Sequence, residues 1–487
     1  MKHSTIACLL FVYFLSACTP TDNGLYASYE SGEVALGGDT YTEVEENPFV
    51  EVNEEPISTF SIDADGASYA NVRRFLMQDG EIPPKGAIRT EELINYFELD
   101  YPNDNLATPI SLNGEVSSCP WNPDNKLVRI GIKGRDIAEQ DLLPSNFVFL
   151  IDVSGSMSSE DKLGYLKTGF NRLVDELNTD DRIAIVTYAG SAGVLLPATS
   201  GSEKQKIKNA INGLSSGGST AGAQGIITAY EIAQQNFIEG GNNRVIIGTD
   251  GDFNVGISDR DELVTLIEEK REFGIFLTVL GVGRGNLNDA ALEQIANNGN
   301  GTYEYIDKAE QIEKVFIHDF KKFFTIAKDV KVQVIFNPEN VKAYRLIGYE
   351  NRILATEDFE DDSKDAGEIG ANQNVTALYE IIPTENENFR NTPSFTIDFR
   401  FKEPNSAISQ ALELQIFDTG QSFEEASNFQ RFTTSIASFS MLLGESEYKG
   451  TSTYSAILGW LEQVNLSDPQ GYKEELKTLV NQAQSLE

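Results

Sequence analysis

Five residues with oxygen-bearing side chains lie in three short segments of the sequence: Asp152, Ser154, Ser156, Thr220 and Asp250. Two of these side chains are carboxylates and three are hydroxyls, all of them hard oxygen ligands. Such a set suits Mg²⁺, Mn²⁺ or Ca²⁺ rather than zinc or copper. If the fold brings the three segments together, the sequence therefore predicts a site for one divalent cation.

The elements around these segments predict an α/β fold with a doubly wound, Rossmann-like parallel sheet over residues 146–326. Continuous apolar runs alternate there with amphipathic helical patterns, which is typical of a parallel sheet covered on both faces. Ligands of such sheets bind at the carboxyl ends of the strands, where Asp152 and Asp250 both fall. A helix is predicted at 160–177, and the predicted strands are 147–151, 183–188, 245–249, 275–282 and 302–306.

The three segments resemble the metal-ion-dependent adhesion site of von Willebrand factor A (VWA) domains, and they occur in the family's order. The resemblance implies that Ser154, Ser156 and Thr220 are hydroxyl ligands and that Asp152 and Asp250 bind directly or through water. It also implies an open coordination position that an Asp or Glu of a partner protein fills. Two carboxylates leave a divalent metal without excess negative charge, so the metal can still attract such an acid. An A domain that folds without metal is the alternative.

Regions on both sides of residues 146–326 add to the resemblance. The segments Ser58–Asp63, Glu92–Phe97, Cys119-Pro-Trp121 and Thr376–Ile381 resemble those of a bacterial subfamily of envelope lipoproteins, whose A domain lies between characteristic flanking regions. We predict an N-terminal flanking region at 57–145, a β-sandwich-like region at 327–420 and a C-terminal helical region at 421–487. The strand patterns at 110–117 and 127–133 could join the sandwich, which would make the A domain an insertion.

The N-terminus predicts export and lipid anchoring. Residues 1–17 have the charged, apolar and small-residue order of a secretory signal peptide. They end in Leu-Ser-Ala before Cys18, which resembles the lipobox of bacterial lipoproteins and implies that Cys18 is acylated. A plain secretory leader with an incidental cysteine is the alternative. Thr19 favours the outer over the inner membrane, so we predict a lipid-anchored protein of the cell envelope.

The segment 18–56 is predicted to be a disordered tether between the lipid anchor and the folded part. It contains ten Asp or Glu after Cys18, no Lys or Arg, and little apolar periodicity. Such a composition repels itself and buries too little apolar surface to fold.

The composition excludes several classes of function. The chain carries 38 Lys and Arg against 75 Asp and Glu, a formal net charge of −37 at pH 7. This charge argues against nucleic acid as a partner. Only two histidines occur, His3 and His318, so the mature chain cannot form a zinc site rich in imidazole. His318 lies in a helical pattern, where we expect it on the surface or in packing.

Two further motifs do not match known ligand loops. Counting from Ser61, the twelfth position of a calcium loop around Asp63-Ala-Asp65-Gly66 is Val72 instead of Glu. We therefore expect a strand end that leads into a helix cap. The run Gly281-Val-Gly283-Arg-Gly285 lacks the last glycine of a dinucleotide fingerprint and predicts a turn.

The function we favour is that of a binding module and not an enzyme. In this hypothesis a membrane-anchored lipoprotein uses its metal to mediate adhesion or protein–protein interaction in the envelope. A scaffold or regulatory subunit of an envelope complex is the first alternative. A metal-dependent hydrolase is the second, but the sequence offers no nucleophile–base pair for it.

Overall fold

A doubly wound A domain lies at the centre of the chain, as predicted. The computed structural model describes residues 33–36, 38–43, 45–63, 65–103, 108–218, 222–251, 260–364, 366–385, 389–404 and 406–487. Six strands form the A-domain sheet in the order β12-β11-β10-β7-β8-β9. They are β7 (Ser145–Asp152), β8 (Arg182–Ala189), β9 (Ser191–Ser200), β10 (Asn242–Thr249), β11 (Ile275–Val282) and β12 (Thr302–Ile306).

The edge strand β9 was not predicted. It runs antiparallel to β8, whereas the other neighbouring pairs of the sheet are parallel. Its residues are mostly exposed or half-exposed, so it lacks the continuous apolar run by which the buried strands were recognised.

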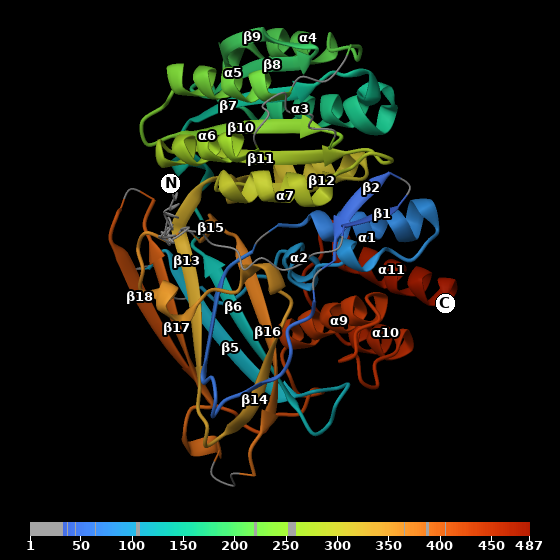
Figure 1. The fold of residues 1–487 in the computed structure, drawn as a ribbon, viewed down its shortest axis with the longest axis vertical. Helices are drawn as coiled ribbons and strands as arrows, with labels where there is room; N and C mark the ends of the chain where they lie inside the picture. The colour runs from blue at the N-terminus through green and yellow to red at the C-terminus, as the bar shows by residue number, and fades with distance from the viewer. Residues whose placement is uncertain are drawn as a thin grey trace, which may run out of the picture. The chain divides into compact units, whose positions relative to one another are not determined.

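Helices cover both faces of the A-domain sheet because successive side chains of a strand point to opposite faces. On β7, Val148 and Leu150 belong to the core that includes residues of α5, α6 and α7, whereas Phe147, Phe149 and Ile151 belong to the core that includes residues of α3 and α4. Figure 1 shows these helices around the sheet. Their bounds are Tyr165–Glu176 for α3, Lys204–Asn212 for α4, Gly222–Gln235 for α5, Arg260–Glu272 for α6 and Asp289–Asn298 for α7.

Two antiparallel sheets form the predicted β-sandwich. One contains β4 (Ile57–Ser61), β13 (Thr325–Phe336), β15 (Gly367–Gly370), β17 (Phe395–Lys402) and β18 (Ser409–Ile416). The other contains β3 (Val50–Glu51), β5 (Ile110–Ser118), β6 (Lys126–Gly134), β14 (Val341–Ile347) and β16 (Asn374–Pro383). Buried side chains of both sheets share one apolar core. Because β5 and β6 precede the A domain and β13 follows it, the A domain is inserted into the sandwich (Figure 1).

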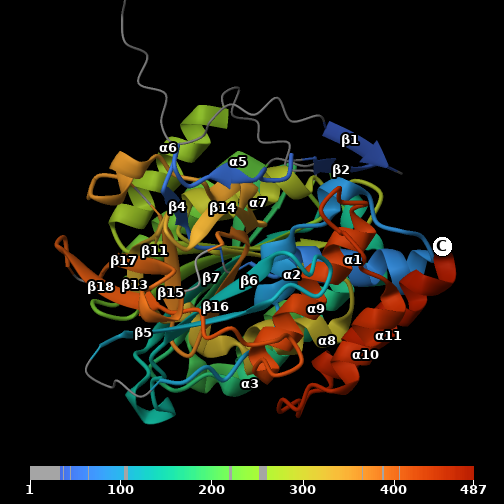
Figure 2. The same ribbon diagram turned by 90° about the horizontal axis from the view of Figure 1, so that it is seen from below.

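The C-terminal region is helical, as predicted, and packs against the helices that precede the A domain. Its helices are α9 (Asn428–Leu443), α10 (Tyr454–Glu462) and α11 (Tyr472–Leu486). They share an apolar core with α1 (Ala67–Arg74) and α2 (Thr90–Asn95). Figure 2 shows these helices from below. Within the described residues, we find no helix with both the length and the apolar character needed to cross a membrane.

The prediction of a disordered tether is wrong for the described residues between 33 and 56. The structure places strands β1 (Glu33–Leu36) and β2 (Asp39–Thr42) there, besides β3. Tyr41 is fully buried in the core on one face of the A-domain sheet. Asp39 forms an ion pair with Arg74 at 2.8 Å, so its charge is used inside the fold instead of in solvent. The predicted signal peptide, Cys18 and residues 19–32 lie outside the described residues.

Candidate metal centre

The predicted ligands Asp152 and Asp250 lie at the point of the A-domain sheet where the strand order reverses. Strands β7 and β10 are neighbours, and the chain continues from β7 to β8 on one side and from β10 to β11 on the other. Asp152 is the last residue of β7, and Asp250 directly follows β10. Such a switch point is where open α/β sheets bind their ligands.

Asp152 is a buried carboxylate with no cationic partner among the residues that the structure describes. Its Oδ1 accepts a hydrogen bond from the amide of Ser154 at 2.8 Å, and its Oδ2 lies 3.4 Å from the hydroxyl of Thr249. Burial raises the pKa of the Asp152 carboxyl, an effect that the Ser154 hydrogen bonds oppose and the charge of Asp250 reinforces. Among the described residues, no lysine or arginine forms an ion pair with Asp152. A bound cation would supply the missing positive charge.

The two serines of the first segment lie together above this carboxylate. Their hydroxyl oxygens are 2.9 Å apart, with Ser154 buried and Ser156 exposed. Backbone hydrogen bonds join this loop to the second segment, from Gly155 N to Gly218 O at 3.1 Å and from Gly217 N to Val153 O at 2.7 Å. Thr220, the predicted ligand of that second segment, lies outside the described residues.

Asp250 differs from Asp152 because it already has a cationic neighbour. The ammonium group of Lys162 donates to Asp250 Oδ2 at 2.9 Å and to Asn286 Oδ1 at 2.9 Å. Burial by itself would raise the pKa of Asp250, but hydrogen bonds from Ser156, Lys162 and Asn286 hold that pKa below its usual value. Asp250 is therefore held as a carboxylate.

This arrangement fits one small divalent cation. Asp152, Ser154, Ser156 and Asp250 are brought to one edge of the sheet by two strand ends, and all four offer hard oxygen ligands. The side chains could hold Mg²⁺, and the same oxygens suit Mn²⁺ and Ca²⁺. When bound, the metal would act as a Lewis acid toward an external oxygen ligand.

Sequence reasoning missed Lys162 and Asn286. Lys162 lies in a π-helical turn, Glu160–Gly164, that opens the helix predicted at 160–177, where a lysine looks like an ordinary surface residue. Asn286 follows the glycine run after β11, which we interpreted only as a turn. The structure explains one glycine of that run: Gly283 has φ +73°, and a Cβ at that position would lie 2.3 Å from Cε of Lys162.

A second group of acidic residues is neutralised within the fold. Asp63, Glu92 and Glu293 are buried, and one carboxylate oxygen of each lies within 4.8 Å of the others. Arg352 pairs with Asp63, and Arg89 pairs with Glu92 and Glu293. These acids therefore belong to an ion-pair network between the A domain and its flanks.

The expected helix cap at Asp63–Gly66 is not present. The strand β4 does lead into α1, but no side chain caps that helix at Gly66. Asp63 Oδ1 instead accepts from the amide of Asp65, and Asp65 Oδ1 accepts from the amide of Tyr303 on β12, 3.0 Å in each case. The short acidic motif thus joins the flank to the A domain.

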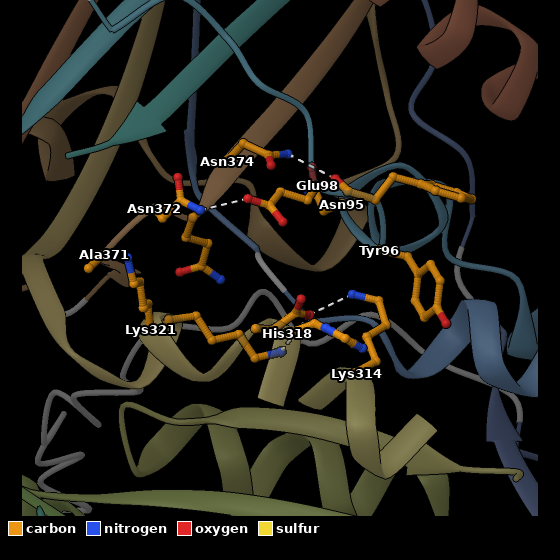
Figure 3. Close-up of a pocket in the computed structure, with 13 residues that line it drawn as sticks. Asn95, Tyr96, Glu98, Lys314, His318, Lys321, Ala371, Asn372 and Asn374 are labelled. Carbon is orange, nitrogen blue, oxygen red and sulfur yellow. Dashed lines mark hydrogen bonds and ion pairs between the residues drawn. The ribbon is translucent and has the colours of Figure 1, made fainter. Parts of the chain in front are cut away.

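His318 lines a small pocket (Figure 3). Lys314, Lys321 and Lys322 are among its lining residues, and Lys314 is paired with Asp319 at 2.5 Å. No serine, threonine or cysteine is among the described residues that line it. Among the described lining residues, His318 therefore has no serine, threonine or cysteine nucleophile beside it.

Comparisons with known proteins match most of the chain. The family model of the von Willebrand factor type A domain matches residues 146–318, and a model described as von Willebrand factor matches residues 35–129. A third, described as the C-terminal part of the uncharacterized protein YfbK, matches residues 321–486. The match at 35–129 begins inside the segment that we predicted as a tether.

Individual proteins are also similar to this chain. The uncharacterized protein YfbK of Escherichia coli (strain K12) is 39% identical over 467 residues, which are 91% of this chain and 80% of that protein. A von Willebrand factor type A structure from Catenulispora acidiphila has 16% identity and a TM-score of 0.42, covering 78% of this chain and 91% of its own. The conserved hypothetical protein BatB from Bacteroides thetaiotaomicron has 25% identity and a TM-score of 0.32, covering 37% of this chain and 98% of its own.

Proposed function

The chain belongs to the family of VWA-domain proteins represented by YfbK of Escherichia coli, and we propose that its A domain binds one divalent cation to hold a partner protein. The ligands in this proposal are Asp152, Ser154, Ser156, Thr220 and Asp250. VWA domains commonly mediate protein–protein interaction. The metal would be Mg²⁺, with Mn²⁺ and Ca²⁺ as alternatives, and an Asp or Glu of the partner would complete its coordination.

One observation carries this proposal. The carboxylate of Asp152 is fully buried at a ligand-binding edge of the sheet, beside two hydroxyl groups and with no cationic partner among the described residues. A buried charge without compensation is costly, so the native fold gains by binding a cation there. The partner's carboxylate in this proposal implies an interaction role, and we propose no chemical reaction.

Substitution of Asp152 by alanine is expected to abolish metal binding. Calorimetric titration of Mg²⁺, Mn²⁺ and Ca²⁺ into residues 19–487 should show one saturable site in the wild-type chain. Loss of even an outer-shell partner typically lowers metal affinity 10–100-fold, so Asp152→Ala should lower it by at least about a hundredfold.

The matched control is Asp175→Ala, which removes an exposed carboxylate of α3 that pairs with Lys208. It should bind metal as the wild type does. Equal affinities of the wild-type and Asp152→Ala chains would refute the proposed centre. The titrated chain must begin before residue 33, because β1 and β2 belong to the folded part.

We propose further that the protein is anchored in the cell envelope, at the outer membrane, by acylation of Cys18. Replacement of Cys18 by serine should abolish labelling with a palmitate analogue and move the protein from the membrane to the soluble fraction, because the attachment atom is lost. Cys8→Ser, within the predicted signal peptide, should leave both unchanged. Membrane retention and labelling of the Cys18→Ser chain would contradict lipid anchoring.

A further inference from the structure

Lys162 is held beside the metal centre by a cradle that the fold builds for it. Its side chain is 9% exposed, and its ammonium group contacts Asp250 and Asn286 at 2.9 Å each. Its aliphatic part crosses Gly283, where any Cβ would collide with three carbons of the lysine, the nearest at 2.3 Å. The position of the Lys162 side chain is therefore fixed by its neighbours.

The loop that carries Asn286 is itself fixed. The amides on either side of it, Gly285 N and Leu287 N, donate to Asp39 Oδ1 at 2.7 and 3.0 Å. Asp39 lies on β2, whose Thr40 amide donates to Leu287 O at 2.7 Å. The ammonium group consequently has little freedom to move away from Asp250 when a metal arrives.

We propose that Lys162 is a specificity-determining residue of the metal centre, whose fixed positive charge makes the loaded centre select an anionic ligand. The inference rests on the proposed function, since it presupposes the metal. Asp152 and Asp250 carry two negative charges and Lys162 carries one positive charge. A bound dication therefore leaves the centre with one net positive charge instead of none.

The same charge has two opposite effects. Lys162 competes with the metal for Asp250 and repels it, so it weakens metal binding. It attracts a carboxylate that binds to the loaded metal, so it strengthens ligand binding. Unit charges a few ångströms apart in a partly buried site interact by enough to change an equilibrium constant tenfold or more. A lysine that served only to stabilise the fold would produce neither effect.

The variant Lys162→Met tests this inference, because it keeps most of the length of the side chain and removes its charge. We expect residues 19–487 with this substitution to bind Mn²⁺ about tenfold more tightly than wild type, measured by the electron paramagnetic resonance of free Mn²⁺. We expect acetate to bind the Mn²⁺-loaded variant about tenfold more weakly, measured by water-proton relaxation as acetate displaces metal-bound water.

The control Lys167→Met removes a half-buried lysine of α3 that bonds only to Asn212 O among the described contacts, and both affinities should stay at their wild-type values. If Lys162→Met fails to fold, as judged by its thermal melt, Lys162→Gln takes its place with the same expectations. Unchanged or weaker Mn²⁺ binding, or unchanged acetate binding, overturns the inference while the metal centre stands. If the wild-type chain does not bind Mn²⁺, or if its Mn²⁺ binding does not depend on Asp152, both the inference and the proposed metal centre are overturned.

Discussion

Substitution of Arg89 by methionine is expected to lower the free energy of unfolding by about 3–5 kcal/mol. Arg89 is 8% exposed and pairs with Glu92 on α2 and with Asp289 on α7, at 2.7 Å for the latter. A third carboxylate, Glu293, lies 3.6 Å from the same guanidinium. Methionine keeps much of the aliphatic volume but leaves three buried carboxylates without this cation. Urea unfolding of residues 19–487 at pH 8 measures the loss.

The loss should shrink as the pH falls. Burial raises the pKa of Glu92 and of Glu293, and Arg89 opposes both shifts. Without Arg89 both pKa values rise further, so the native state binds more protons than the unfolded chain over a wider range of pH. Stability that depends on such a raised pKa is present at low pH and is lost as the pH rises. The destabilisation by Arg89→Met should therefore be smaller at pH 5 than at pH 8.

The control for Arg89 is Arg172→Met on α3. Arg172 pairs with Glu313, and both side chains are 37% exposed. Exposed ion pairs contribute little because water screens them, so this variant should lose less than about 1 kcal/mol. Similar losses in the two variants, or a loss for Arg89→Met that does not depend on pH, would contradict the proposed role of the buried network.

The A-domain fold could be predicted because its strands are buried on both faces. The continuous apolar run at 147–151 has that pattern since Val148 and Leu150 face one layer of helices while Phe147 and Phe149 face the other. The edge strand β9 escaped prediction because one edge and much of its surface contact solvent.

The candidate ligands could be predicted for a related reason. Asp152 ends β7 and Asp250 directly follows β10, and these parallel strands end at the same edge of the sheet. Lys162 and Asn286 could not be predicted as neighbours of the site, because they reach it from a helix and from the loop after β11. Which side chains meet from those elements depends on packing that no local pattern records.

The N-terminal segment shows where composition misleads. Ten acidic residues in 19–56 suggested self-repulsion, yet Asp39 is bound by Arg74 and by two backbone amides. A single buried aromatic residue, Tyr41, anchors β2 to the A-domain core. This segment lacks apolar periodicity, and it is ordered because residues distant in the sequence bind it.

Arg73 is the second residue whose replacement should be severe, because it joins three parts of the chain. Its guanidinium donates to both oxygens of Asp307, which follows β12, and to Glu475 on α11 at 2.7 Å. Further bonds to Tyr96 and Gln311 use its remaining donors. Arg73→Met should lower the free energy of unfolding by about 3–5 kcal/mol. It should also speed amide hydrogen exchange in α11.

The variant Arg73→Lys separates charge from geometry. Lysine keeps the positive charge but presents a point charge instead of a planar group with five donors. It therefore cannot donate hydrogen bonds to all four partners of Arg73 at once, which are Asp307, Glu475, Tyr96 and Gln311. We expect it to recover part of the stability and to leave exchange in α11 faster than in the wild type. A fully stable Arg73→Lys chain would show that charge alone suffices. Unchanged exchange in Arg73→Met would show that the apolar core shared by α9, α10 and α11 holds the C-terminal helix without the ion pair.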